Sequence, residues 1–124
     1  MSSAAQSPNV SALETELNQA ILSGKVMEAF EKYYAHDCVM QENSEAPRVG
    51  KEANREVEKA FMDSVQEFHG ASLLGSAING NRAYSEWEYD ITFKGGKRMK
   101  MNQVAVRQWK NGQVAHERFY YSKG

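Results

Sequence analysis

The sequence predicts an α+β domain in which three N-terminal helices pack on a curved, mainly antiparallel sheet. In the first half of the chain, apolar residues recur at three- and four-residue spacing, the period of a helix that buries one face. From Phe68 onward the pattern changes to that of strands, and Gly-containing pairs separate the strand segments. Such pairs favour tight hairpins because their residues adopt positive φ. Helices followed by hairpin-linked strands are typical of the α+β class.

Residues 1–9 are expected to form a disordered lead-in, and residues 10–122 a single domain. The segment Ser11-Ala12-Leu13-Glu14 fits a capping box, which predicts the start of the first helix, and Ser23-Gly24 ends it. The apolar stripe of this helix consists of Val10, Leu13, Leu17, Ala20 and Ile21.

The second helix follows at once, and the third begins after Gly50. The stripe of the second helix is Val26, Phe30, Tyr33 and Tyr34. The stripe of the third is Ala53, Val57, Ala60, Phe61 and Val65. Between these helices, residues 38–42 are predicted to form a short strand and residues 43–49 a loop.

Four longer strands are predicted at residues 68–78, 82–93, 97–110 and 113–121, separated by Asn79-Gly80, Gly95-Gly96 and Asn111-Gly112. If the last two pairs each close a two-residue loop, Trp87 faces Val104 and Val106 faces Glu117. The helix-facing side then holds Leu74, Ser76, Ile78, Ser85, Trp87, Tyr89, Ile91, Phe93, Asn102, Val104, Val106, Gln108, Ala115, Glu117, Phe119 and Tyr121. The opposite side holds Glu86, Glu88, Asp90, Met99, Met101, Gln103, Arg107, Trp109, His116, Arg118 and Tyr120.

Glu117 is the most informative residue, because this register places its carboxylate on an apolar face. A carboxylate in that position must be hydrogen-bonded, be paired with a cation, or have a shifted pKa. It is therefore either a general acid or base or a structural group, with Asn102, Gln108 or a helix N-terminus as its partner. Glu42 could form a pair with Glu117, or it could be a solvated strand end.

Composition and charge exclude several classes of function. The net charge of −1 argues against a nucleic-acid binder that relies on bulk electrostatics. No apolar run reaches the length of a membrane span, and the first residues lack the features of a signal peptide, so a cytoplasmic location is expected. The single cysteine, Cys38, allows no intrachain disulfide. No histidine has a partner at metal-ligand spacing, so no metal is expected. The sequence contains no Gly-rich phosphate loop, and no cofactor is expected.

Three segments resemble the SnoaL-like branch of the cone-shaped NTF2-like superfamily. Residues 29–42 are similar to the family's tyrosine-rich helix end, polar turn and short strand, and residues 49–53 to the glycine that opens its third helix. Residues 109–121 resemble its closing hairpin, with an acidic and aromatic last strand. The resemblance implies a cone with an apolar pocket between sheet and helices, and a homodimer through the outer face of the sheet. Ser122 stands where the cyclases of the family carry a catalytic aspartate, which argues against their chemistry.

The resemblance also suggests where a ligand would bind. The candidate catalytic residues are Glu117 and Glu42, because a related subgroup carries glutamates at these two points. The candidate ligand-binding residues are Trp87, Tyr89, Asn102, Gln108, Phe119, Tyr121 and His69. The aromatic members could instead be ordinary core, and a metal site would require His69 to lie beside Glu42 or Glu117.

The leading hypothesis is a pocket for a small hydrophobic molecule with a carbonyl or hydroxyl group. Its chemistry would be cofactor-free proton transfer at Glu117, of the isomerase, cyclase, dehydratase or hydrolase type. The alternatives are a binding or carrier protein without turnover, and a dimeric association module that uses the outer face. Whether Glu117 titrates near neutrality distinguishes catalysis from binding.

Overall fold

The computed structural model describes residues 9–123 and consists of three helices and a six-stranded sheet. The elements are α1 (Val10–Leu22), α2 (Val26–Tyr33), β1 (Tyr34–Glu42), β2 (Arg48–Val49), α3 (Lys51–Ser64), β3 (Val65–Asn79), β4 (Arg82–Phe93), β5 (Arg98–Lys110) and β6 (Gln113–Tyr120). The predicted α+β class is confirmed. Apart from Asn9, the predicted lead-in lies outside the described residues.

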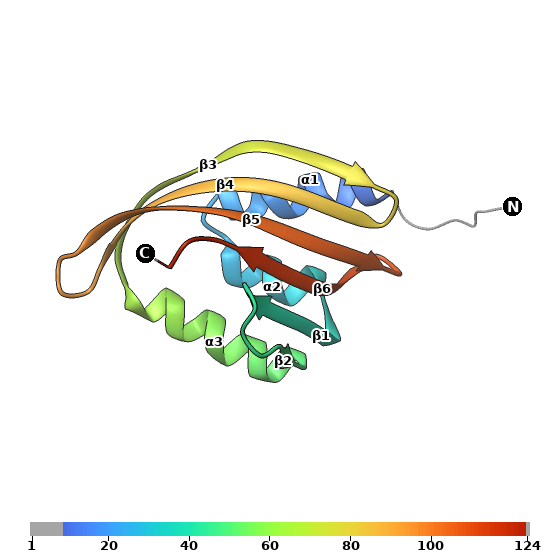
Figure 1. Ribbon diagram of the computed structural model, residues 1–124, viewed down its shortest axis with the longest axis horizontal. Coiled ribbons are helices and arrows are strands. Elements are labelled where there is room, and N and C mark those ends of the chain that lie inside the picture. The colour runs from blue at the N-terminus through green and yellow to red at the C-terminus, as the bar shows by residue number, and fades with distance from the viewer. Residues whose placement is uncertain (1–8, 124) are drawn as a thin grey trace, which may run out of the picture.

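The sheet has the order β2-β1-β6-β5-β4-β3, and only β1 and β6 run parallel. The long strands β3, β4 and β5 curve over the helices, as Figure 1 shows. Helix α1 packs against β3 and β4, whereas α3 packs against β1 and β2. Helix α2 contacts both other helices and β1, so all three helices bound the space between them and the sheet. No helix of the described chain is long and apolar enough to cross a membrane.

The beginning of α1 differs from the predicted capping box. The cap is Asn9, whose side-chain oxygen accepts a hydrogen bond from the backbone N–H of Ala12 at 3.2 Å. Glu14 is therefore not needed at the helix end, and its side chain is buried against the sheet instead. Two further differences are small: β1 begins at Tyr34, directly after α2, and the predicted loop contains the two-residue strand β2.

The register between β4 and β5 differs from the prediction by one residue. The Phe93 N–H donates to the carbonyl of Lys97 at 2.8 Å, so the connection contains three residues, Lys94 to Gly96. Both glycines in it have positive φ, 103° at Gly95 and 96° at Gly96. Because the side-chain period of a strand is two, this shift reverses every side chain of β5. Trp87 faces Gln103, not Val104.

A second irregularity lies in the last hairpin. Its Asn111-Gly112 turn forms as predicted, with positive φ at both residues and Trp109 opposite Val114. Beyond it the pairing shifts by one residue, so that Arg107, not Val106, lies opposite Glu117. The two shifts cancel for β6, and Glu117 remains on the helix-facing side as predicted.

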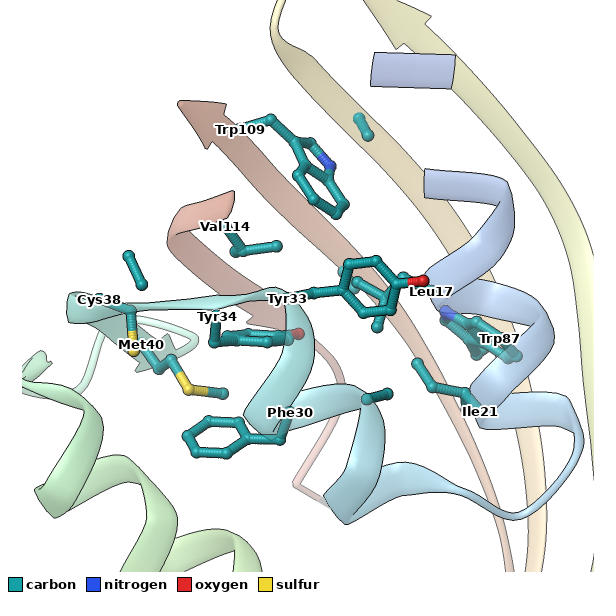
Figure 2. Packing of buried hydrophobic residues seen from close by; sticks show 14 residues of the cluster. Leu17, Ile21, Phe30, Tyr33, Tyr34, Cys38, Met40, Trp87, Trp109 and Val114 are labelled. Atoms are coloured by element: carbon teal, nitrogen blue, oxygen red, sulfur yellow. The ribbon is translucent and has the colours of Figure 1, made fainter. Parts of the chain in front are cut away.

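The buried core lies where α1 and α2 meet the sheet. Leu17 and Ile21 of α1 belong to the same buried cluster as Trp87. Figure 2 shows Ile21 near Trp87, and the rings of Phe30 and Tyr34 beside each other. The two rings stack with their centroids 5.0 Å apart. At the other end of this core, Tyr33 meets Trp109 edge to face. This packing fixes the position of Tyr34, whose hydroxyl group reaches Glu117.

Candidate functional site

A cavity of about 300 Å³ lies between the helices and the sheet. Its walls come from every helix and from strands β1 and β3 to β6, with two more residues supplied by the segments after α1 and β6. The lining residues are Leu17, Ile21, Gly24, Val26, Ala29, Phe30, Tyr34, Glu42, Glu58, Phe61, Met62, Val65, Phe68, Tyr89, Ile91, Met101, Gln103, Arg107, Glu117, Phe119 and Tyr121. Most of these side chains are apolar or aromatic, which is typical of small-molecule pockets.

Glu117 is buried at this cavity and is held on both carboxylate oxygens. Its Oε1 accepts a hydrogen bond from the Tyr34 hydroxyl at 2.7 Å, and its Oε2 accepts one from Arg107 Nε at 2.7 Å. Burial raises the pKa of Glu117 above its ordinary value, although the Arg107 charge and both hydrogen bonds act in the opposite direction. The prediction that Glu117 must be partnered or have a shifted pKa is therefore confirmed on both counts.

Arg107 is the cation of the site, and the predicted register had placed it on the outer face. It is only 2% exposed. Besides Glu117, it binds Glu14 and Asn18 of α1, through Nη1 at 2.7 and 2.8 Å. Its Nη2 donates no hydrogen bond to any group of residues 9–123, and this nitrogen is not completely buried. Arg107 thus lines the cavity with one donor group to spare.

The polar network continues away from the cavity into the buried core between α1 and the sheet. We call this region, which contains Glu14, Asn18, Ser85 and Trp109, the closed end of the interior. Glu14 also accepts hydrogen bonds from Trp109 Nε1 at 2.9 Å and from Ser85 Oγ at 2.8 Å. Asn18 in turn donates to Ser85 Oγ at 3.0 Å. Arg107 therefore lies between two carboxylates, Glu14 and Glu117, and both ion pairs are buried. One positive charge between two carboxylates leaves this group with an excess of negative charge.

Glu42 and Glu117 line the same cavity, but they do not contact each other. The Glu42 carboxylate pairs with Arg48 at 2.8 Å and accepts a hydrogen bond from the Tyr121 hydroxyl at 3.0 Å. Burial and the Glu42 charge raise the pKa of Tyr121 to about 12, so this hydroxyl stays protonated and donates. Glu42 is thus a paired group at the edge of the cavity.

Glu58 of α3 is a third carboxyl group at the cavity, and the sequence did not single it out. No group of residues 9–123 donates a hydrogen bond to it, whereas Glu42 and Glu117 both have partners. Burial, followed by the negative charges of Glu117 and Glu42, raises its pKa to about 7. The predicted stripe of α3 ran through Val57, yet Val57 is 39% exposed, and Glu58 lies four residues before the cavity-lining Met62 on the same helix face.

Several predicted ligand-binding residues lie elsewhere. The reversed register places Asn102 and Gln108 on the outer face, so the prediction that they face inward was wrong. Asn102 is exposed and binds Glu88 instead of Glu117. Trp87 does not line the cavity and is fully buried in the core behind Tyr89, on which it stacks with centroids 5.6 Å apart.

His69 also lies away from the cavity. Its Nε2 is 2.7 Å from Thr92 Oγ1, and its Nδ1 is 3.5 Å from a carboxylate oxygen of Glu67. It contacts neither Glu42 nor Glu117, so the arrangement that a metal site would have required is not formed. Among residues 9–123, no group of three or more His, Cys, Asp or Glu side chains could hold a metal ion.

The arrangement brings together the parts that proton transfer to an organic molecule requires. The walls are largely apolar, the Glu58 and Glu117 carboxyl groups have raised pKa values, and Arg107 Nη2 can donate a hydrogen bond to an oxygen of the molecule. Tyr89, Phe119 and Tyr121 line the walls as predicted.

Comparisons with known proteins agree with this architecture. A family model described as a SnoaL-like domain matches residues 13–121. A protein from Mesorhizobium loti, proposed to be a SnoaL-like polyketide cyclase [carbohydrate phosphatase], is 30% identical, with a TM-score of 0.83 over 92% of this chain and 100% of that chain. No curated protein matches the chain.

Two further solved structures are under 25% identical and support the fold alone. One is a proposed isomerase from Rhodopseudomonas palustris, 16% identical, with a TM-score of 0.72 over 91% of this chain and 89% of that chain. The other, from Catenulispora acidiphila, has a ketosteroid isomerase-like fold and was solved in complex with trimethylamine. It is 14% identical, with a TM-score of 0.74 over 95% of this chain and 88% of that chain.

Proposed function

The chain belongs to the SnoaL-like domain family, and from this premise we propose that its cavity binds a small, mainly apolar molecule bearing a carbonyl or hydroxyl oxygen. We further propose that the carboxyl groups of the cavity exchange a proton with this molecule without a cofactor. The observation that carries the proposal is a cavity of about 300 Å³ with apolar walls, which two carboxyl groups of raised pKa also line.

The roles follow from the contacts. The Glu117 carboxylate is fixed by Tyr34 and Arg107, and each of its oxygens keeps a second lone pair that can face a ligand. It is the proposed acid or base, and Glu58 is the second carboxyl group able to take that role. Arg107 Nη2 would hold the oxygen of the molecule and stabilise negative charge that develops on it. Phe119 and Tyr121 would hold the apolar body and exclude water.

A ketone probe tests binding and proton transfer separately. With 2-tetralone in D₂O, exchange of the hydrogens next to the carbonyl is followed by NMR, and binding by the thermal shift of the protein. We expect exchange above the buffer rate, and a loss of at least about tenfold in Glu117→Gln or Glu58→Gln. Glu56→Gln is the matched control, because Glu56 is an exposed glutamate on the same helix as Glu58. Exchange that survives in both test variants would contradict the proposed proton transfer.

The second candidate is a binding or carrier protein without turnover. One observation favours it: both oxygens of Glu117 already accept strong hydrogen bonds, as in a structural ion pair. Binding of 2-tetralone without any exchange would support this candidate, whereas the absence of binding would contradict both.

We also propose a homodimer through the outer face of the sheet, which sedimentation velocity at micromolar concentration tests directly.

A further inference from the structure

The carboxyl groups at and beside the cavity outnumber the cations. Four carboxyl groups lie there, contributed by Glu14, Glu42, Glu58 and Glu117, against the two guanidinium groups of Arg48 and Arg107. With every group ionised, the site therefore carries two more negative than positive charges. Burial makes such an excess costly unless a proton or another cation neutralises it.

The excess is concentrated at Glu58. Arg48 pairs with Glu42 across 2.8 Å, and Arg107 is shared by Glu14 and Glu117. Neither guanidinium donates a hydrogen bond to Glu58, whose carboxylate receives none from any group of the described residues. Glu58 is only partly exposed, and it lines the cavity.

Other groups packed around Glu58 do not supply the missing charge. Tyr34, Tyr89 and Tyr121 line the same cavity, and burial raises the pKa of each phenol above its ordinary value, so all three stay neutral. Lys59, the neighbour of Glu58 in the chain, is exposed and does not line the cavity. Lys51 is the first residue of the same helix. It donates to the backbone carbonyls of Glu31 and Tyr34, and it does not line the cavity.

The walls beside these carboxyl groups are largely aromatic. Seven aromatic side chains line the cavity: Phe30, Tyr34, Phe61, Phe68, Tyr89, Phe119 and Tyr121. Aromatic faces carry negative potential and attract ammonium groups, more strongly where water is excluded. The same walls attract the apolar part of a molecule. Negative charge and aromatic ring faces in one cavity therefore favour a ligand with a positive charge and an apolar body.

We propose that the molecule this cavity selects is a cation, an apolar amine in its ammonium form, held by the Glu58 carboxylate and the aromatic walls. The inference rests on the proposed function, since it names the class of molecule that the same cavity binds. Glu58 is then the counter-ion of the ammonium group, and Glu117 remains available for proton transfer. The donor group Arg107 Nη2 remains available for an oxygen of the molecule.

The inference predicts a pH dependence with a definite sign. Without a cation in the cavity, the Glu58 carboxyl holds a proton below its pKa of about 7. A bound ammonium group favours the ionised form, so binding must release that proton, and affinity must fall as pH falls below about 7. The other charged groups that act on the Glu58 carboxyl are Glu42, Glu117, Arg48 and Arg107.

The test uses three probes of similar shape and different charge. Benzyltrimethylammonium carries a fixed positive charge, neopentylbenzene is its neutral isostere, and phenylacetate is an anion. Binding is measured by calorimetry at constant ionic strength, at about pH 8 and about pH 5.5. We expect the cation to bind at least about tenfold more tightly than the neutral isostere at the higher pH, and this advantage to shrink at the lower pH.

Two variants assign the effect to its residue. Glu58→Gln should remove the preference for the cation over neopentylbenzene and the pH dependence of that preference, and Glu56→Gln should keep both. Equal binding of the cation and the neutral probe, or tighter binding of phenylacetate, would overturn the inference and leave the proposed binding function standing. Failure of all three probes and of 2-tetralone to bind would overturn the proposed function as well.

Discussion

Two carboxyl groups of the interior, Glu14 at the closed end and Glu58 at the cavity, have opposite surroundings. At the closed end, Glu14 accepts hydrogen bonds from Arg107, Trp109 and Ser85. At the cavity end, Glu58 accepts none from residues 9–123, and its pKa rises to about 7. The difference teaches that surrounding donors tie a carboxyl group into the structure, whereas a carboxyl group without them favours its neutral form.

Removing Arg107, the cation that joins Glu14 of the closed end to Glu117 of the cavity, should produce the largest effect. Arg107→Met leaves Glu14 and Glu117 as buried carboxylates without their shared partner. The free energy of unfolding, measured by urea denaturation, should fall by about 3–5 kcal/mol. Arg98→Met is the control on the same strand, because Arg98 pairs with Asp90 at the surface, and it should change stability far less. Equal losses in both variants would contradict the importance of burial.

The two buried tryptophans separate hydrogen bonding from packing. Trp109 Nε1 donates to Glu14 at 2.9 Å, whereas Trp87 Nε1 has no hydrogen-bond partner in the described part of the chain. Both side chains are at most 2% exposed, so Trp→Phe removes similar packing at each position. We expect Trp109→Phe to cost about 1.5–3 kcal/mol more than Trp87→Phe in urea denaturation, because it leaves a charged acceptor short of a donor. Similar costs would show that packing alone decides.

Glu58 should make the folded protein less stable as pH rises. Its pKa is about 7 in the folded state against 4.5 ordinarily, so the folded state holds the additional proton. The stability that this proton contributes is complete below the ordinary pKa and is lost as pH rises through about 7. Across this pH range the loss should be about 3 kcal/mol relative to Glu58→Gln, whose side chain does not titrate. Urea denaturation at several pH values measures it, with Glu56→Gln as control, and parallel curves for the wild type and Glu58→Gln would refute it.

The fold and one end of the site could be predicted from the sequence. Helical spacing, the Asn-Gly turn and the order of the elements determined the α+β class. Glu117 was found because a charged residue interrupted an apolar face. That success was partly fortunate, since one three-residue turn at Lys94–Gly96 and one bulge near Trp109 shift the register in ways that cancel in β6. Turn length and bulges depend on tertiary twist, which local pattern does not record.

The same two shifts explain what the sequence concealed. They reverse β5, so Arg107 was assigned to the outer face, and Asn102 and Gln108 to the pocket. Glu58 was missed for a related reason: the prediction followed Val57 as the apolar position, but the helix is rotated so that Val57 is partly exposed. Glu14 was interpreted as part of a cap because its true partners are distant in sequence. In each case the deciding contact is long-range.

The smallest effect expected tests this reversal directly. Gln103 lines the cavity, whereas its neighbour Asn102 is exposed on the opposite face of β5. Gln103→Ala should therefore weaken binding of a probe that fills the cavity by about two- to tenfold, since it removes contacts from the wall. Asn102→Ala should leave the affinity unchanged in the same calorimetric titration. The opposite result would contradict the observed register and support the predicted one, in which Asn102 faces the pocket and Arg107 lies on the outer face. The two substitutions affect adjacent residues, and only one of them should change the affinity for the probe. The comparison therefore separates the cavity from the outer face without depending on the stability of either variant.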